Sequence, residues 1–342
     1  MRYDLPPLDL SEHLMPIPRS HLQGALLSLA AFALYATNDV IVKYLGSNAQ
    51  YHPFQTIFFS GLLSFPLMTI LMMSDRSDGN LRPKMPGWTA LRSVLTVLNG
   101  LTGFYAFSVL PLSEAYPIFF AMPMLVTLLA IPMLGEKVGL HRGLAVVVGL
   151  AGVMVVVRPG SGDFGLGHIA ALSAAGLGAM NSVLVRKTGH AERSAVIMLY
   201  PMIANFIVAG LALPFVYKPM PVTDLGLVAA MAFLGLTASM LAIAAYRRAP
   251  AVIVAPMQYS QIIWATIFGT LIFNESHDLW TAGGTAIIIL SGIYIVLRED
   301  KPRVSRNRPV LETRSRFDTG LTPRLSTWLR FFDSRRANKG EV

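Results

Sequence analysis

Apolar stretches, each close to the length of a membrane span, fill most of the chain, and short polar segments separate them. Ten can be recognised, at about 22–44, 53–73, 88–109, 113–134, 140–157, 167–186, 194–216, 224–246, 250–273 and 279–297. A helix needs about 20 residues to cross a bilayer core of about 30 Å. These stretches are apolar on all faces, whereas a surface helix of a soluble protein shows a polar stripe. The pattern predicts an all-α membrane protein with ten transmembrane helices.

The second half of the chain repeats the first. At an offset of 139 residues the matched pairs are Pro111 and Pro250, Pro117 and Pro256, Glu136 and Glu275, and Leu140 and Leu279. At an offset of 143 they are Gly24 and Gly167, Asn38 and Asn181, Lys43 and Arg186, and Gly46 and Gly189. Each repeat holds five predicted helices, an odd number, so the second repeat enters the membrane in the opposite orientation. Two inverted five-helix repeats are typical of transporters whose substrate site lies between the halves.

Basic residues lie mainly in alternate loops, and this pattern gives the orientation. With the N-terminus inside, 13 Lys and Arg residues fall on the cytoplasmic side and three outside, not counting the tail from Arg298 onward. The positive-inside rule predicts this asymmetry. We expect a cytoplasmic lead-in at 1–21, repeats at 22–157 and 158–297, and a basic cytoplasmic tail at 298–342. Within the tail, residues 325–332 form either an amphipathic helix on the inner leaflet or, as we favour, part of a disordered solvated segment.

Composition agrees with a membrane protein and excludes several functional classes. The 342 residues are 54% hydrophobic and 14% charged, with a mean hydropathy of +0.54, whereas soluble domains carry about 25% charged residues. The net charge of +9 is explained by the loop topology and does not point to nucleic acid. The chain has no cysteine, no phosphate-binding G-x-x-x-x-G-K-[ST] loop and no H-E-x-x-H zinc motif. We therefore expect no metal, no cofactor and no direct use of ATP.

The first predicted helix carries the sharpest functional signal. Asn38 and Asp39 lie well inside the span, and Lys43 lies near its outer end. Ionisable groups inside a span are costly and usually face the bundle interior. The position equivalent to Asp39 in the second repeat is Ser182, so the carboxylate belongs to one half only. Asp39 is a candidate substrate-binding or proton-coupling group; the alternative is a local salt bridge with Lys43, four residues away.

Two prolines and two glutamates recur at matching places. Pro117 and Pro256 fall about two turns into equivalent helices, where each removes a backbone hydrogen bond and bends the helix. A helix broken at the same place in both halves is the best sequence indication of a transport site, and a purely structural kink is the alternative. Glu136 and Glu275 close the same helices. We expect them to be structural groups that satisfy free N–H groups at the start of the next helix.

Other polar and aromatic side chains fall in the middle of predicted helices. The candidates for lining a cavity, beside Asn38, Asp39 and Lys43, are Asn99, Tyr105, Asn181, Gln258, Tyr259, Gln261 and Trp264. Any one of them can instead form hydrogen bonds between helices, which are worth about 0.6 kcal/mol each on average. The fifth and tenth predicted helices carry small residues and almost no polar side chain in their middle, so we expect them to be peripheral packing helices.

The duplicated arrangement of two prolines and a glutamate resembles the EamA branch of the drug/metabolite transporter superfamily. It consists of Pro111, Pro117 and Glu136 in the first repeat and Pro250, Pro256 and Glu275 in the second. The segment NDVIVKYLG at 38–46 is similar to members that import S-adenosylmethionine or riboflavin in bacteria, and other members export amino acids. The resemblance implies a basket of helices 1–4 and 6–9 around a central cavity, with helices 5 and 10 outside.

These observations predict a secondary transporter that moves a small organic metabolite by alternating access. The bacterial inner membrane is the expected location, and the partners are the metabolite, the lipid bilayer and a coupling proton. We expect the cavity between the repeats, lined by the first, third, fourth, sixth and ninth helices. The alternatives are a membrane-embedded enzyme, which needs His, Asp and Glu residues grouped near one interface, and a channel, which needs no inverted broken helices. One protomer holds both repeats, so oligomerisation is not required.

Overall fold

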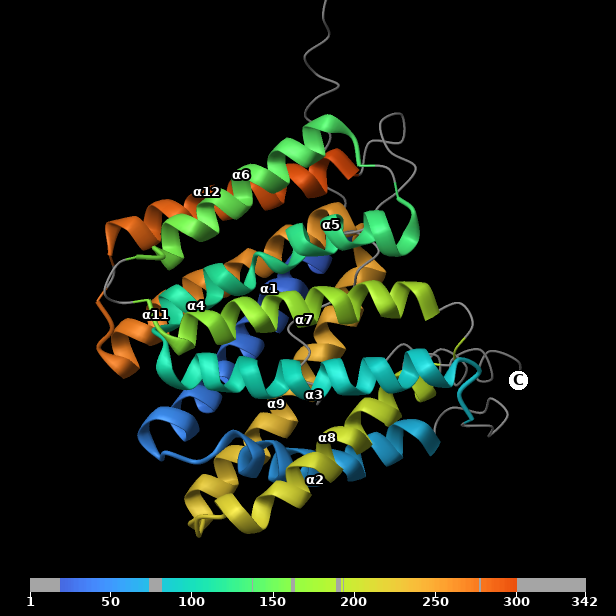
Figure 1. Ribbon diagram of the computed structural model, residues 1–342, viewed down its shortest axis with the longest axis vertical. Helices are drawn as coiled ribbons and strands as arrows, with labels where there is room; N and C mark the ends of the chain where they lie inside the picture. The colour runs from blue at the N-terminus through green and yellow to red at the C-terminus, as the bar shows by residue number, and fades with distance from the viewer. Residues whose placement is uncertain are drawn as a thin grey trace, which may run out of the picture.

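The computed structural model describes residues 19–73, 82–136, 138–160, 164–188, 192, 194–276 and 278–299. Within these ranges the chain forms a bundle of helices (Figure 1), and the predicted all-α class is confirmed. Residues 1–18 of the expected lead-in lie outside the described residues. So do residues 300–342 of the expected tail, including the segment 325–332.

The helices follow the ten apolar stretches, and two of the stretches are divided into shorter pieces. The elements are α1 (Arg19–Lys43), η2 (Tyr44–Asn48), α2 (Pro53–Met73), α3 (Pro86–Val109), α4 (Leu112–Phe119), α5 (Met122–Leu134), α6 (Leu140–Val157), α7 (Leu166–Thr188), α8 (Ser194–Val216), α9 (Val222–Arg248), α10 (Ala251–Val254), η3 (Ala255–Tyr259), α11 (Ser260–Phe273) and α12 (Leu279–Glu299). By length and hydropathy, seven helical segments of the described chain could cross a membrane. The count of ten spans therefore stays a prediction.

The two divided helices break at matching places. In the first half α4 ends at Phe119 and α5 begins at Met122, because Pro123 has no N–H to bond the carbonyl of Phe119. In the second half a 3₁₀ segment, η3, carries Pro256 in its first turn. The two breaks touch, since the ring centroids of Phe120 and Tyr259 lie 5.0 Å apart. These two residues are themselves separated by the 139-residue offset of the repeat.

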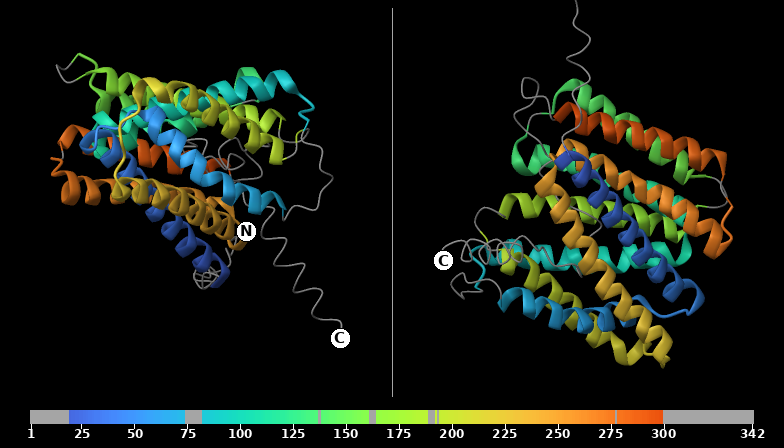
Figure 2. Two further views of the ribbon diagram at one scale, coloured as in Figure 1. Left: turned by 90° about the horizontal axis from the view of Figure 1, so that it is seen from below. Right: turned by 180° about the vertical axis from the view of Figure 1, so that it is seen from behind.

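The largest helix–helix contacts correspond when the two halves are exchanged. Helix α1 packs on α9, and its counterpart α7 packs on α3, which is the counterpart of α9. Helix α2 packs on its own counterpart α8, and α6 packs on its own counterpart α12. Figures 1 and 2 show α6 and α12 side by side along one edge of the bundle, with α2 and α8 at the opposite edge.

Glycine allows α6 and α12 to approach closely. A Cβ atom built on Gly152 would lie 3.0 Å from the carbonyl oxygen of Gly284, and one built on Gly284 would lie 2.7 Å from the carbonyl oxygen of Gly152. Small residues at such crossings let backbones meet, which is the main source of helix association within lipid. The edge position of both helices agrees with the packing role expected of them (Figure 1).

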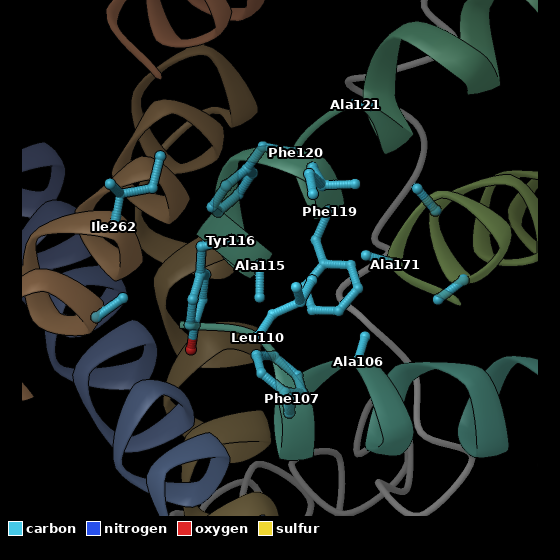
Figure 3. Close-up of a cluster of buried hydrophobic side chains, with 14 of the residues drawn as sticks. Ala106, Phe107, Leu110, Ala115, Tyr116, Phe119, Phe120, Ala121, Ala171 and Ile262 are labelled. Carbon is cyan, nitrogen blue, oxygen red and sulfur yellow. The ribbon is translucent and has the colours of Figure 1, made fainter. Parts of the chain in front are cut away.

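An aromatic cluster fixes the corner between α3 and α4. The Phe107 ring lies 5.7 Å from that of Tyr116 and 4.8 Å from that of Phe119, measured between centroids. All three side chains are buried. Figure 3 shows them together with Leu110 and Ala115. Edge-to-face aromatic pairs add about 0.5–1.5 kcal/mol beyond their burial. The corner therefore holds α4 in a defined place beside α1.

Candidate functional site

A cavity lies among α1, α2, α3 and α9. Its empty volume is about 580 Å³, counting space open to solvent. The polar lining residues are Asn38, Asp39, Thr56, Ser60 and Ser64. The apolar and small ones are Val42, Ile57, Gly100, Phe104, Phe107, Met231, Ala232 and Gly235. The cavity therefore has a polar wall from α1 and α2, and aromatic side chains from α3.

A buried carboxylate is the main charged group of this cavity wall. Asp39 is 4% exposed, and its Oδ2 accepts a hydrogen bond of 2.7 Å from the hydroxyl of Tyr116. In Figure 3 the Tyr116 hydroxyl points away from the aromatic cluster and toward α1. A charge buried in a span is costly unless it is bonded or faces a polar cavity. The α3–α4 corner supplies the bond, and the cavity supplies the polar surroundings.

Two further oxygens on this wall have no hydrogen-bond partner among the described residues. They are Oδ1 of Asn38, which is 7% exposed, and Oγ1 of Thr56, which is 1% exposed. Buried polar atoms are bonded in the great majority of cases, and leaving one unmet costs about 1–3 kcal/mol. Both residues line the cavity. A bound solute or water that donates hydrogen bonds would satisfy them.

The contribution of α2 was missed in the sequence. Thr56, Ser60 and Ser64 follow one another at intervals of four residues, which places them on one face of a helix. That spacing was a usable signal, because three small polar residues share one stripe of an otherwise apolar span. Tyr116 was missed too, since only the folded corner brings it to Asp39.

The other predicted site residues lie outside this cavity. Asn99 and Asn181 are buried on α3 and α7, two helices that pack on each other. The Asn99 Oδ1 atom lies 3.5 Å from where a Cβ of Gly178 would stand, so Asn99 faces α7. Tyr105 is 38% exposed on α3.

The predicted residues of the second broken helix do not line the cavity either. Tyr259 is buried, and its hydroxyl packs against Gly292 of α12. The Trp264 ring stacks on Phe268 of its own helix, with centroids 6.0 Å apart. Gln258 is half-buried on η3, and Gln261 is buried on α11. Of the helices expected to line the cavity, only the first (α1) and the third (α3) do so. The second and eighth predicted helices, which are α2 and α9, line it as well.

Lys43 pairs with the second half of the molecule. Its Nζ lies 3.0 Å from Oε1 of Glu275 and donates a hydrogen bond of 2.5 Å to the carbonyl of Leu110. The same Glu275 carboxylate accepts the backbone N–H of Leu112, with Oε2 at 2.8 Å and Oε1 at 3.1 Å. Glu275 was expected to serve the next helix of its own repeat. It instead caps α4 of the other repeat. The fold brings the start of α4, with the free N–H of Leu112, within hydrogen-bonding distance of the Glu275 carboxylate.

Glu136 makes the corresponding contact in the other direction. Its Oε1 accepts a hydrogen bond from Nη2 of Arg186 on α7, in an ion pair. Glu136 is the repeat equivalent of Glu275, and Arg186 is the equivalent of Lys43. Each ion pair therefore joins a cation of one repeat to a carboxylate of the other.

Comparison with a family model shows which protein family this chain belongs to. The model of the EamA-like transporter family matches residues 22–158 and again residues 165–298. The chain belongs to the EamA-like transporter family. Its resemblance to that family, inferred from the duplicated prolines and glutamates, is confirmed, and the two matched ranges correspond to the two repeats.

Relatives of this EamA-like protein are bacterial transporters. The S-adenosylmethionine uptake transporter of Rickettsia prowazekii is 26% identical, over 84% of this chain and 97% of the relative. The riboflavin transporter of Vibrio cholerae is also 26% identical over the same shares. The pseudopaline exporter of Pseudomonas aeruginosa is 24% identical over 79% of this chain and 94% of the relative. The EamA-like protein is an integral, multi-pass membrane transporter.

A solved structure shares the fold. Its sequence is 18% identical, and the two structures superpose with a TM-score of 0.55 over 81% of this chain and 99% of that one. The likeness supports the helical architecture described above.

Proposed function

We propose that this EamA-like protein is a secondary transporter that carries a small organic metabolite bearing a cationic group, by alternating access between two inverted five-helix repeats. The observation that carries the proposal is the buried Asp39 carboxylate in the wall of a cavity. The packing of α1 on α9, α7 on α3, α2 on α8 and α6 on α12 supports the repeat arrangement, since these main contacts correspond when the two halves are exchanged. Because 13 of 16 basic residues before the tail fall on one side, we place both termini in the cytoplasm and the protein in the bacterial inner membrane.

The chemistry of the cavity narrows the cargo. Asp39 is an anion, the unmet amide oxygen of Asn38 accepts hydrogen bonds, and the hydroxyl of Thr56 can accept or donate one. The carboxylate and the amide oxygen favour a cargo that donates hydrogen bonds and carries positive charge. Phe104 and Phe107 add aromatic faces, which bind a flat ring or a cation.

Among the cargoes named for the relatives, S-adenosylmethionine has both a positive charge and a flat base, and it is our first candidate. Riboflavin offers the flat ring and hydrogen-bond donors without the charge, so it is the second, and an amino acid is the third. Asp39 would bind the cationic group directly, or would carry a coupling proton that leaves when the cation arrives.

Counterflow in proteoliposomes tests the proposal. Vesicles are loaded with S-adenosylmethionine, riboflavin or mixed amino acids, and labelled tracer is added outside, with and without a pH gradient. We expect saturable exchange of one solute, reduced about thirtyfold by Asp39→Asn, since a charge-assisted hydrogen bond is worth about 2 kcal/mol. The control is Asp278→Asn, which removes a half-exposed carboxylate paired with Arg158 at the surface. Undiminished exchange by Asp39→Asn, in protein that reaches the vesicles, would contradict the assignment.

A further inference from the structure

Two ion pairs of the same construction stand at opposite ends of the bundle. Glu275 follows α11, where the chain turns into α12, and Glu136 follows α5, where the chain turns into α6. Figure 1 shows these two connections at opposite ends of the long helices. Lys43 ends α1 beside the first connection, and Arg186 lies in the last turn of α7 beside the second.

The four charged side chains are almost withdrawn from the surface. Their exposed fractions are 9% for Lys43, 8% for Glu275, 12% for Arg186 and 10% for Glu136. The surface pair of Arg158 and Asp278 is 31% and 40% exposed. Burying an ion pair often gains no stability over apolar packing. Stability alone therefore does not explain why equivalent residues form a buried ion pair at each end of the helices.

Each pair ties a first helix to a broken helix. At one end Lys43 and Glu275 connect α1 with α11, and Glu275 also holds the start of α4 through Leu112. At the other end Arg186 and Glu136 connect α7 with α5. A broken helix can change its angle at the break without losing regular hydrogen bonds elsewhere. The pairs thus hold the helical pieces that are best able to move.

On α1 the first pair lies one turn from the cavity, and on α4 the N–H that Glu275 binds lies one turn from Tyr116. Asp39 precedes Lys43 by four residues on α1, and Tyr116 follows Leu112 by four residues on α4. Four residues of a helix correspond to a rise of about 6 Å. The Tyr116–Asp39 hydrogen bond thus lies one turn from the group formed by Lys43, Glu275 and the backbone of Leu110 and Leu112, and both sets of contacts connect α1 with the start of α4.

We propose that the Lys43–Glu275 and Arg186–Glu136 pairs are the two closures of the transport path, one at each end, and that they open one at a time. The proposal rests on the transport function proposed above. The conformation described here has both pairs formed, which in this proposal is the state in which neither closure has opened. Opening either closure breaks one ion pair between equivalent residues, and a bound solute can shift the population between the two open states.

Sided labelling of a cavity cysteine tests the closures without any substrate. The chain has no cysteine, so Ser60→Cys on the cavity wall gives a single thiol with no background. A membrane-impermeant thiol reagent is applied to right-side-out and to inside-out vesicles. Glu275→Gln should raise the labelling rate about tenfold or more from the side that carries Lys43, because the loss of a charge-assisted hydrogen bond has that effect on a population. Glu136→Gln should do so from the opposite side.

Further variants keep the test decisive. Asp278→Asn, at the surface pair, should leave both rates unchanged. Glu275→Asp and Glu136→Asp keep the charge but shorten the reach, so they should give smaller rises on the same two sides if the Gln variants do not fold. Exchanging the charges in Lys43→Glu with Glu275→Lys restores the ion pair but not the bonds to Leu110 and Leu112, so it should return the rate only part of the way toward that of Ser60→Cys alone. If Glu275→Gln and Glu136→Gln both raise the labelling rate from the same side, or if neither raises it in folded protein, the two ion pairs are not the closures of the path.

The two proposals fail separately. If labelling segregates by side but no solute exchanges, the closures stand and the cargo assignment falls. If a solute exchanges but labelling does not segregate, transport stands and the closures fall.

Discussion

The two halves of the molecule are alike at their ends and different in their centres. Both halves place a cation at the end of the first helix, Lys43 in one and Arg186 in the other, against a glutamate of the opposite half. In the centre, the first half supplies Asp39 bonded to Tyr116, whereas the equivalent positions of the second half hold Ser182 and Ala255. The duplicated ends suit a movement that must run in both directions. The unduplicated centre suits a cargo that is not symmetric.

The ends also differ in how many bonds hold them. Glu275 bonds Lys43 and the N–H of Leu112, whereas Oε2 of Glu136 has no hydrogen-bond partner among the described residues. We expect Glu275→Gln to lower the free energy of unfolding by about 3 kcal/mol, as for a buried ion pair that loses one partner. Glu136→Gln should cost less. Thermal unfolding in detergent measures the stability of both variants. An equal loss would show that the two ion pairs are held equally strongly.

The centre is tested by a matched pair of equivalent positions. Asp39→Asn should reduce transport about thirtyfold, which corresponds to about 2 kcal/mol. Ser182→Ala should leave transport within about twofold, because the Ser182 hydroxyl donates to the carbonyl of Gly178 in its own helix. Initial rates of tracer exchange at matched protein content give the comparison. A similar loss in both variants would mean that the second half also binds the cargo.

The peripheral helices offer a smaller effect with an internal control. Gly284→Ala would bring a methyl group within 2.7 Å of the Gly152 carbonyl oxygen, so α6 and α12 must separate. We expect a loss of about 1.5 kcal/mol, as for overpacking in general. Gly283→Ala meets nothing within 4 Å and should be neutral or slightly stabilising, because alanine favours the helix. Melting temperatures of the two variants are measured in one detergent. Equal values would show that α6 and α12 can separate at their crossing without a loss of stability.

The smallest effect is expected at a contact between the η2–α2 connection and α9. The Tyr51 hydroxyl donates a hydrogen bond of 2.7 Å to Asp224, and Tyr51→Phe should cost about 1 kcal/mol. Burial, followed by the bond to Asp224, raises the pKa of Tyr51 from 10.0 to about 12. The neutral phenol is thus favoured in the folded state, and its contribution is complete below pH 10 and is lost as the pH rises from 10 to about 12. The difference in melting temperature between the two proteins should not change between pH 7 and 9; a change there would show that Tyr51 titrates earlier.

Much of this protein follows from its sequence alone. The apolar stretches predict where helices lie, because only a helix satisfies its backbone groups within lipid. The repeat offset identifies Lys43 with Arg186 and Glu136 with Glu275, and so marks the four residues that form the two ion pairs. The sequence predicts a break at Pro117, whereas Pro117 lies inside α4 and the break falls just before Pro123. The 3₁₀ segment carries Pro256, as the sequence predicts, where a missing N–H interrupts regular bonding.

Only the tertiary structure shows which residues interact with one another across the helices. Sequence spacing offered Asp39 as the neighbour of Lys43, whereas the fold pairs Lys43 with Glu275 from the other repeat. It also lined the cavity with α2 and α9 and turned Tyr259 toward α12. The physical reason is that a helix apolar on every face carries no periodic signal for which face turns inward. Which faces meet depends on contacts between distant segments, such as the glycine crossing of α6 with α12, and these exist only once all the helices are packed together.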